Sequence, residues 1–268
     1  MIYSNIQVID CIELCKSLPE NHIDLTVTSP PYDQIRDYTS KGTLSLDSLG
    51  VELLRITKDG GICAMVIQDG TKEYGKSITT HRTICSWVDS GWKLFECCIY
   101  NRPGKPGAWW SRRFRVDHEY ILLFLKGNRP NTFTKEHLKI PAKHAGVKWH
   151  GTQRMTDGTM TKIEEKVQAD TKCPGTVWEY SGSSSESNKT KNLHPAPYPD
   201  KLCGDLIECF SKPDDIIFDP FLGSGTTAVM SKKLNRNFIG GDIAEEYIEL
   251  AKQRINEECN SVINKIQE

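Results

Sequence analysis

A short stretch near the N-terminus combines a hydroxyl, two prolines and an aromatic ring directly after an apolar run. Residues 23–27 (IDLTV) are mostly apolar or β-branched, which is typical of a buried strand. The sequence TSPPY follows at residues 28–32. Because prolines donate no backbone hydrogen bond and hold φ near about −65°, the strand must end in a stiff, extended elbow. Ser29 and Tyr32 on this elbow could hold a flat ring that bears an amino group. A Pro-Pro turn that only ends the strand is the alternative.

A glycine-rich loop lies far along the chain, between a predicted strand at residues 216–221 and a predicted helix. The loop is GSGTT at residues 223–227. In this arrangement, backbone N–H groups and a helix N-terminus meet a ligand. The loop lacks the lysine of a P-loop, which argues against a triphosphate. Asp242, nineteen residues after Gly223, ends the next predicted strand, where a carboxylate can accept hydrogen bonds from ribose. The pair indicates an adenosine-containing cofactor, NAD or S-adenosylmethionine; a glycine turn with an N-capping Asp is the alternative.

The elbow distinguishes between these two cofactors. In a doubly wound sheet, ligands bind outside the carboxyl ends of the strands, where the strand order reverses. If the strand that ends near Phe221 neighbours the strand that ends near Ser29, the loop and the elbow face each other across that crevice. A hydride acceptor needs no rigid array of hydrogen-bond acceptors, whereas an amino group about to be methylated does. The combination therefore favours S-adenosylmethionine.

The chain alternates predicted strands with predicted helices. Strands are expected at residues 2–10, 23–27, 62–67, 92–100, 118–125, 216–221 and 237–242. Helices are expected at residues 11–18, 44–56, 77–88, 201–210 and 245–255, and a turn at 58–61 (KDGG). The alternation predicts an α/β fold with a doubly wound, largely parallel sheet.

Between residues 127 and about 190 the apolar periodicity fades, and SGSSSES at residues 181–187 is low in complexity. We therefore expect an insertion at residues 128–190. It would separate a catalytic half at 1–127 from a cofactor-binding half at 191–268 of the same domain. A chain of 268 residues is long enough for such a domain.

The composition is that of a soluble globular protein, with 38% hydrophobic and 26% charged residues. No apolar run reaches the ~20 residues that span a bilayer, and the N-terminus shows no signal-peptide pattern. The ten cysteines are scattered without a Cys-x-x-Cys pair. We therefore expect a cytoplasmic protein without membrane contact, disulfides or a metal site.

The middle of the chain is strongly basic, although the net charge of the whole chain is −1. Residues 101–150 contain eleven Lys or Arg against three Asp or Glu. Aromatic residues are interleaved with these cations, as a surface for nucleic acid requires. A solvated basic surface is the alternative. The candidate contacts to nucleic acid are Arg102, Lys105, Arg112, Arg113, Arg115, Trp149 and Arg154.

The elbow and the loop together resemble the amino-group DNA methyltransferases, which modify cytosine N4 or adenine N6. The motifs are TSPPY at residues 28–32 and DPFLGSGTT at residues 219–227. Their order, with the catalytic motif before the cofactor motif, is similar to that of the beta class. Further similar segments are IDC at 9–11, KDGG at 58–61, HEYIL at 118–122, HPAPYP at 194–199 and GDI at 241–243.

The resemblance implies a seven-stranded sheet whose last hairpin is antiparallel, with a target-recognition insert at about residues 128–190. Catalysis would depend on Ser29, Pro30, Pro31 and Tyr32, without a cysteine nucleophile. Double-stranded DNA is the implied partner, and its target base must be flipped out of the duplex. A cognate restriction endonuclease and a homodimer stay open. The residues implied to bind S-adenosylmethionine are Asp10, Cys11, Tyr198, Asp219, Phe221, Gly223, Ser224, Gly225, Thr226, Thr227, Asp242 and Ile243.

The expected target base depends on Ser29. Adenine-modifying members of the family usually carry Asp or Asn at this position, and Ser is commoner among the cytosine-N4 enzymes. We therefore expect cytosine N4, with adenine N6 as the alternative. A nicotinamide-dependent oxidoreductase would leave the elbow and the basic middle unexplained, and an inactive DNA-binding subunit would not need both motifs intact. RNA or a protein amide stays open as the substrate.

Overall fold

A central eight-stranded sheet organises the chain. The computed structural model describes residues 4–31, 44–102, 114, 116–180 and 198–266. In pairing order the strands are β1 (Ser4–Val8), β14 (Asn237–Asp242), β13 (Ile216–Asp219), β2 (Ile23–Thr28), β3 (Thr57–Ile67), β7 (His118–Leu125), β6 (Lys93–Asn101) and β12 (Val177–Glu179). Only β7 runs antiparallel to its two neighbours. The predicted α/β fold with a mostly parallel sheet is confirmed. The expected number of seven strands is wrong by one, because the short β12 adds to β6 in parallel.

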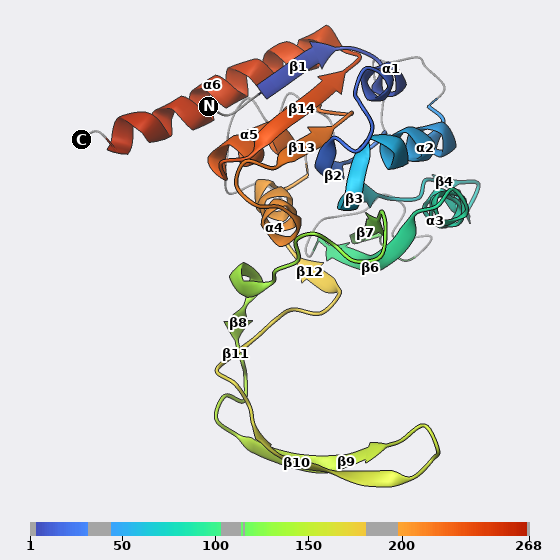
Figure 1. Cartoon of the computed structure of the whole chain (residues 1–268), viewed down its shortest axis with the longest axis vertical. Helices are drawn as coiled ribbons and strands as arrows, with labels where there is room; N and C mark the ends of the chain where they lie inside the picture. The colour runs from blue at the N-terminus through green and yellow to red at the C-terminus, as the bar shows by residue number, and fades with distance from the viewer. Residues whose placement is uncertain (1–3, 32–43, 103–113, 115, 181–197, 267–268) are drawn as a thin grey trace. The chain divides into compact units, whose positions relative to one another are not determined.

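Helices cover both faces of this sheet (Figure 1). Helices α1 (Cys11–Lys16), α2 (Leu46–Ile56) and α3 (Thr79–Asp89) pack against one another in sequence order on one face. Helices α4 (Asp200–Phe210), α5 (Thr226–Lys233) and α6 (Glu245–Ile266) do the same on the other. Among the described residues, no helix combines the length and apolar character that crossing a membrane would require.

The core beneath α1, α2 and α3 is closed by aromatic side chains at one end of the sheet. Trp87 of α3 stacks on Trp92 with ring centroids 5.8 Å apart and lies 4.7 Å from the ring of Phe124. Both indole nitrogens donate to carbonyls of α2, those of Leu46 and Gly50, at 2.9 Å. Buried Trp N–H groups need such partners, so this packing also fixes α2 over β3.

The KDGG segment, where the sequence predicts a turn, belongs to the first part of β3. Gly60 adopts a positive φ of 78°, and its N–H donates to the carbonyl of Lys126 at 2.8 Å. The pairing register with β2 shifts between Ile23 and Leu25. The glycines thus form an irregularity within a strand, because tertiary pairing supplies the partners that a turn would otherwise provide.

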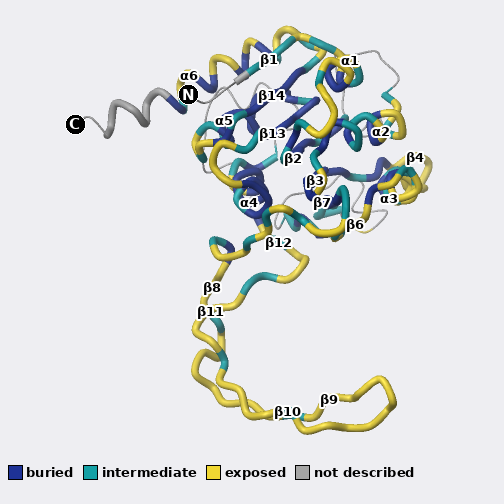
Figure 2. The backbone as a smooth tube through the Cα atoms, in the orientation of Figure 1, coloured by how far each residue is buried: buried dark blue, intermediate teal, exposed yellow. Residues whose placement is uncertain are grey.

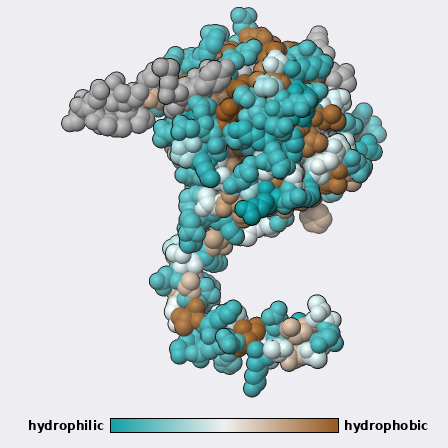
Figure 3. Space-filling model, in the orientation of Figure 1, coloured by the Kyte–Doolittle hydropathy of each residue, from teal (hydrophilic) through white to brown (hydrophobic). Residues whose placement is uncertain are grey.

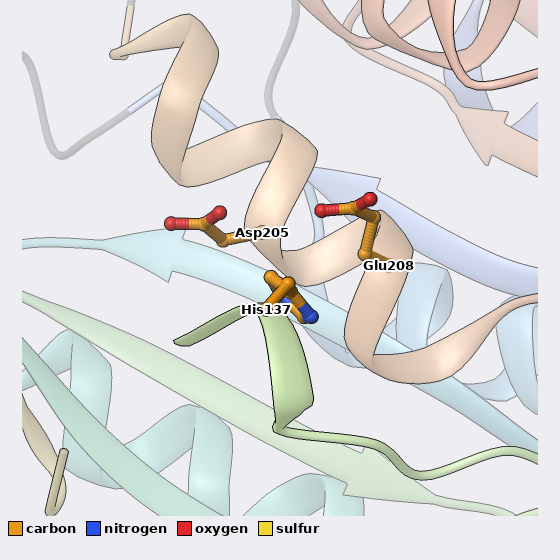
Figure 4. A group of neighbouring side chains, drawn as sticks. All are labelled: His137, Asp205 and Glu208. Carbon is orange, nitrogen blue, oxygen red and sulfur yellow. The ribbon is translucent and has the colours of Figure 1, made fainter. Parts of the chain in front are cut away.

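The short strand β12 is tied to α4 by a buried hydrogen bond. Tyr180 follows β12, and its hydroxyl donates to Asp205 Oδ2 at 2.8 Å. Burial, with the nearby Asp205 carboxylate, raises the pKa of Tyr180 far above its usual range. Figure 4 shows Asp205 and Glu208 projecting from α4. This hydrogen bond fixes the end of β12 relative to α4.

Residues 135–175 form a separate compact unit, whereas 1–134 and 176–268 make up the other. This unit is shorter than the insert expected at residues 128–190. It contains a 3₁₀ turn (Glu136–Leu138), the short pair β8 (Ile140–Pro141) and β11 (Thr171–Lys172), and a longer hairpin of β9 (Lys148–Arg154) and β10 (Met160–Val167). Nearly all of the hairpin is exposed (Figure 2), so it lacks the apolar periodicity that would have predicted strands. A second small hairpin, β4 (Thr71–Lys72) and β5 (Gly75–Lys76), follows β3.

Candidate active site

The carboxyl ends of β2 and β13 lie side by side. Phe218 pairs with Thr26 in a parallel register, one residue before the DPF motif begins. From β13 the chain continues to β14 on one side, and from β2 to β3 on the other, so the strand order reverses between them. The expected neighbourhood of the elbow and the glycine-rich loop is therefore confirmed. Ligands bind at such a reversal point in doubly wound sheets.

Asp219 joins the two strand ends through its carboxylate. Oδ1 accepts hydrogen bonds from Thr28 Oγ1 at 2.6 Å and from the Phe221 N–H at 3.1 Å. Oδ2 accepts from Thr227 Oγ1 at 2.6 Å. Burial raises the pKa of Asp219 to about 6, although the bonds from Thr227 and Thr28 act in the opposite direction. The carboxylate thus connects the residue before Ser29 to the first turn of α5.

Tyr198 reaches the same cluster from the segment before α4. Its hydroxyl lies 2.6 Å from Thr227 Oγ1, and Thr227 Oγ1 also lies 3.2 Å from the carbonyl of Val27. Burial raises the pKa of Tyr198 well above its usual value. Three segments far apart in sequence therefore meet in one buried polar network.

The glycine-rich loop is held in a conformation that needs its glycines. Gly223 and Gly225 have positive φ values of 49° and 79°. A Cβ on Gly225 would lie 2.8 Å from the Cβ of Ala251 on α6. Asp242 Oδ2 accepts from the Gly223 N–H at 3.0 Å, and Oδ1 accepts from the Ala244 N–H at 3.0 Å. Each carboxylate oxygen keeps a second lone pair, so Asp242 can shape the loop and still accept from a ribose hydroxyl.

The end of β1 adds a second carboxylate beside β14. Asp10 caps α1, with Oδ1 accepting from the N–H groups of Ile12 at 2.8 Å and Glu13 at 3.3 Å. Oδ2 takes no part in these bonds. Cys11 follows, and burial with the nearby Asp10 raises the pKa of its thiol to about 12, which leaves it unreactive. The capping role of Asp10 was not foreseen.

The carboxyl ends of β1, β14 and β13 fit a ligand in which an adenosine group is attached to a methionine. Two carboxylates, Asp10 and Asp242, lie at neighbouring strand ends. Ile243 exposes 51% of its surface beside Asp242, which suits contact with a flat apolar ring. Ser224, Thr226 and the half-buried Phe221 complete the loop at the end of β13.

The elbow follows β2 directly. Ser29 and Pro31 are half-buried, and Pro30 is buried. Tyr32, the fourth predicted catalytic residue, lies outside the described residues. The elbow therefore directly follows the strand end that Asp219 fixes by accepting a hydrogen bond from Thr28.

The residues predicted to contact DNA differ in burial and in their location in the fold. Arg102 donates to Glu119 Oε1 at 2.8 Å, with only 17% of its side chain exposed, so it supports the end of β6. Trp149 and Arg154 lie five positions apart in β9, hence on opposite faces of the hairpin. The remaining predicted contacts, Lys105, Arg112, Arg113 and Arg115, lie outside the described residues.

One residue at the site was not foreseen. Arg254 of α6 is fully buried and donates to the Ser224 carbonyl and to Thr226 Oγ1 behind the glycine-rich loop. The signal in the sequence was an arginine at helical spacing from Leu250 and Ala251, within the apolar face of the predicted helix at 245–255.

The comparisons with known proteins agree with this geometry. A family model for DNA methylases that modify N6 or N4 amino groups matches residues 23–253. The chain belongs to this family. This methyltransferase is 32% identical over 243 residues to the orphan methyltransferase M.BamHII of Bacillus amyloliquefaciens, covering 87% of this chain and 88% of that protein. It is 28% identical over 264 residues to the type II methyltransferase M.HpaI of Haemophilus parainfluenzae, covering 94% and 74%.

Solved structures show the same fold. The PvuII DNA methyltransferase matches with a TM-score of 0.70 at 21% identity, covering 98% of this methyltransferase and 93% of that chain. M1.HpyAVI in complex with S-adenosylmethionine matches with a TM-score of 0.61 at 20% identity, covering 94% and 99%. As a family member, this methyltransferase uses S-adenosylmethionine to methylate DNA.

Proposed function

We propose that this methyltransferase transfers the methyl group to N4 of a cytosine that has been flipped out of double-stranded DNA. The single observation that carries the proposal is the pairing of β13 with β2, which brings the elbow beside the glycine-rich loop. The hydrogen bond from Thr28 to Asp219 supports it, because it fixes the residue before Ser29 relative to that loop.

The elbow supplies hydrogen-bond acceptors for the amino group of the target base. The lone pair of an exocyclic amino group is delocalised into the ring, so the nitrogen is a poor nucleophile. Acceptance of its two N–H bonds by Ser29 Oγ and the Pro30 carbonyl turns that lone pair toward the bound cofactor, which supplies a methyl group on a sulfonium. Catalysis then consists of positioning and preorganised electrostatics. Proline keeps these acceptors rigid.

The loop side of the site binds the cofactor in this proposal. Asp242 accepts from ribose, Asp10 Oδ2 accepts from the adenine amino group, and Ile243 contacts the ring. The segment around Tyr198 and Phe221 lies beside the methionine moiety. The hydrogen bonds of Asp242 to Gly223 and Ala244 support the assignment, because they hold the carboxylate at the strand end.

Cytosine N4 is proposed over adenine N6 because of Ser29. The family resemblance associates Asp or Asn at this position with adenine. The PvuII enzyme, which shares the fold, is named as cytosine-N4-specific. Both observations favour cytosine, and adenine N6 is the alternative outcome of the test.

The hairpin of β9 and β10 is the proposed element for reading DNA, since a two-stranded ribbon fits the major groove. Arg154 pairs with Met160, and Thr152 pairs with Lys162, so these side chains share one face with His150. Trp149 pairs with Lys166 on the opposite face. Figure 3 shows mostly hydrophilic residues on the visible side of this unit. We propose that the face of Arg154 meets the bases.

Paired substitutions test this choice of face. We expect Arg154→Ala to weaken binding of the target duplex by roughly ten-fold or more, because a base contact of this type contributes about 1–3 kcal/mol. Trp149→Ala on the other face should leave the Kd nearly unchanged. Fluorescence anisotropy with labelled duplex at fixed salt measures both, and the reverse ranking would assign the opposite face to DNA.

The names of the relatives support a proposal for the role in the cell. M.HpaI and several others are named type II methyltransferases, whereas M.BamHII is named an orphan methyltransferase. We propose that this enzyme protects DNA in a restriction-modification system or acts alone. An endonuclease partner and a homodimer stay predictions.

Mass spectrometry of nucleosides tests the proposed base. DNA from cells that express the enzyme should contain N4-methylcytosine, and DNA from cells that express Ser29→Ala should contain far less. N6-methyladenine instead would assign the alternative base. Neither modified nucleoside, with a folded enzyme that binds S-adenosylmethionine, would contradict both assignments.

A further inference from the structure

Arg254 on α6 is fully buried, yet every nitrogen of its guanidinium has a partner. Nη1 donates to the Ser224 carbonyl at 3.3 Å and to Thr226 Oγ1 at 2.9 Å. Nη2 donates to Asp200 Oδ1 at 2.8 Å, and Nε donates to Glu258 Oε1 at 2.7 Å. A planar fork of this kind fixes the directions of several partners at once.

The partners of this fork belong to the two segments that line the cofactor site. Ser224 and Thr226 are part of the glycine-rich loop. Asp200 opens α4 two residues after Tyr198, whose hydroxyl contacts Thr227 on the other side. Tyr198 and Arg254 therefore each connect the glycine-rich loop with the segment that leads into α4, through different atoms.

The charges around Arg254 indicate that this residue positions the segments it contacts. A cation beside the first turn of α5 opposes the helix dipole, and its burial carries a desolvation cost. Asp200 and Glu258 offset that cost, and Lys233 in turn pairs with Glu258 at 2.6 Å. Burial raises the pKa of Glu258, but its bonds to Lys233 and Arg254 prevail and lower it to about 2. Well-packed apolar side chains often replace a buried ion cluster without loss of stability, so the cluster is better explained by what it positions.

A second contact places α6 against the same loop. Ala251 lies one turn before Arg254, and its Cβ approaches Gly225 so closely that no side chain fits there. The side chains of Ala251 and Arg254 share one helix face. α6 thus contacts the loop at Gly225 by close packing and at Ser224 and Thr226 by hydrogen bonds.

We propose that Arg254 is a positioning residue for cofactor binding, which holds the glycine-rich loop and the Tyr198 segment in the conformation that receives S-adenosylmethionine. This inference depends on the proposed assignment of the loop to the cofactor. Arg254 touches neither reactant, so its loss changes affinity for the cofactor and leaves the chemical step intact.

Arg254→Lys, compared with Lys233→Met, tests the proposal in the full-length enzyme. Lysine keeps the charge but loses the fork, whereas Lys233→Met disturbs the outer side of the same cluster without touching the loop. We expect Arg254→Lys to raise the Kd for S-adenosylmethionine about ten-fold, as loss of hydrogen bonds to a charged group implies. The kcat at saturating cofactor and the KM for DNA should stay within about two-fold. Lys233→Met should bind the cofactor as the wild type does.

Calorimetric titration with S-adenosylmethionine and steady-state kinetics separate the outcomes. An unchanged Kd in Arg254→Lys, or an equal loss in Lys233→Met, would overturn the positioning role. A wild-type enzyme that binds no S-adenosylmethionine at the loop would overturn the site assignment as well, which distinguishes the two failures.

A second pair of variants keeps the test valid if Arg254→Lys does not fold. Asp200→Ala removes the carboxylate that accepts from Arg254 Nη2, whereas Glu249→Ala, on the exposed side of α6, leaves the fork intact. We expect Asp200→Ala to weaken cofactor binding roughly five-fold or more and Glu249→Ala to bind nearly as the wild type. Equal affinity in the two variants would contradict the proposal.

Discussion

The strand-end network around Asp219 and the hairpin of β9 and β10 differ in almost every physical respect. At the strand ends, Thr28, Asp219 and Thr227 are buried and joined by hydrogen bonds of 2.6 Å. In the hairpin, every residue of β10 except Ile163 is exposed. The network fixes the ends of two neighbouring strands in one geometry, whereas the hairpin presents exposed side chains. Substitutions should therefore change stability and cofactor binding in the first region, and DNA binding in the second.

The hairpin can be removed cleanly, which gives the largest expected effect. The N–H of Gln168 donates to the Val147 carbonyl at 2.9 Å, so the two ends of residues 148–167 are adjacent. We expect replacement of 148–167 by a short Gly-Ser turn to reduce DNA methylation by about 100-fold or more. The melting temperature should change by only about 2 °C, and the Kd for S-adenosylmethionine by less than about two-fold, because the strands bury little surface. Loss of cofactor binding in this variant would remove the contrast between the regions.

Two glycines with similar backbone angles allow a matched comparison of the two regions. Gly225 in the loop has φ +79° and almost no space for a Cβ, whereas Gly158 in the hairpin has φ +87° and no atom within 4 Å. We expect Gly225→Ala to lower the free energy of unfolding by about 3 kcal/mol and to weaken cofactor binding. Gly158→Ala should cost only about 1 kcal/mol, the conformational penalty alone. Denaturant unfolding measures both, and equal costs would show that the loop tolerates a side chain.

The raised pKa of Asp219 predicts a pH dependence of stability. A carboxyl whose pKa is about 6 in the folded state binds its proton more tightly than in the unfolded state, where the pKa is about 3.9. Its contribution to stability is therefore fully present below about pH 4 and is lost as the pH rises through 6. As the pH rises over this range, we expect the free energy of unfolding of the wild type to decrease by about 2–3 kcal/mol relative to that of Asp219→Asn. A difference between the two proteins that does not change with pH would contradict the buried, raised pKa.

Removal of a single hydroxyl gives the smallest contrast. Thr28→Val deletes the donor to Asp219 Oδ1 without a change of shape, so we expect a loss of about 1–2 kcal/mol in stability. Thr161→Val on the exposed β10 is the control and should stay within about 0.5 kcal/mol. Thermal unfolding monitored by circular dichroism measures the pair. Similar small shifts for both would mean that the network is not coupled to folding.

Much of the fold followed from local patterns. The apolar runs of β2, β7 and β14 and the helical spacing of α2 and α4 predicted these elements to within a few residues. The β9–β10 hairpin was missed because its exposed strands carry no alternation of apolar residues, and KDGG was misread because its partner lies on a distant strand.

By itself, the sequence determined the elbow at Ser29, the glycine-rich loop at Gly223 and the family, because these depend on residue types in short, contiguous motifs. Only the tertiary structure decided what these motifs contact. Asp219 joins the two strand ends, and Arg102 pairs with Glu119. Arg254 supports the loop from thirty residues away in sequence. Such partners are set by the order of strands in the sheet and by the packing of helices on it, which bring residues distant in sequence together, so short contiguous motifs do not specify them.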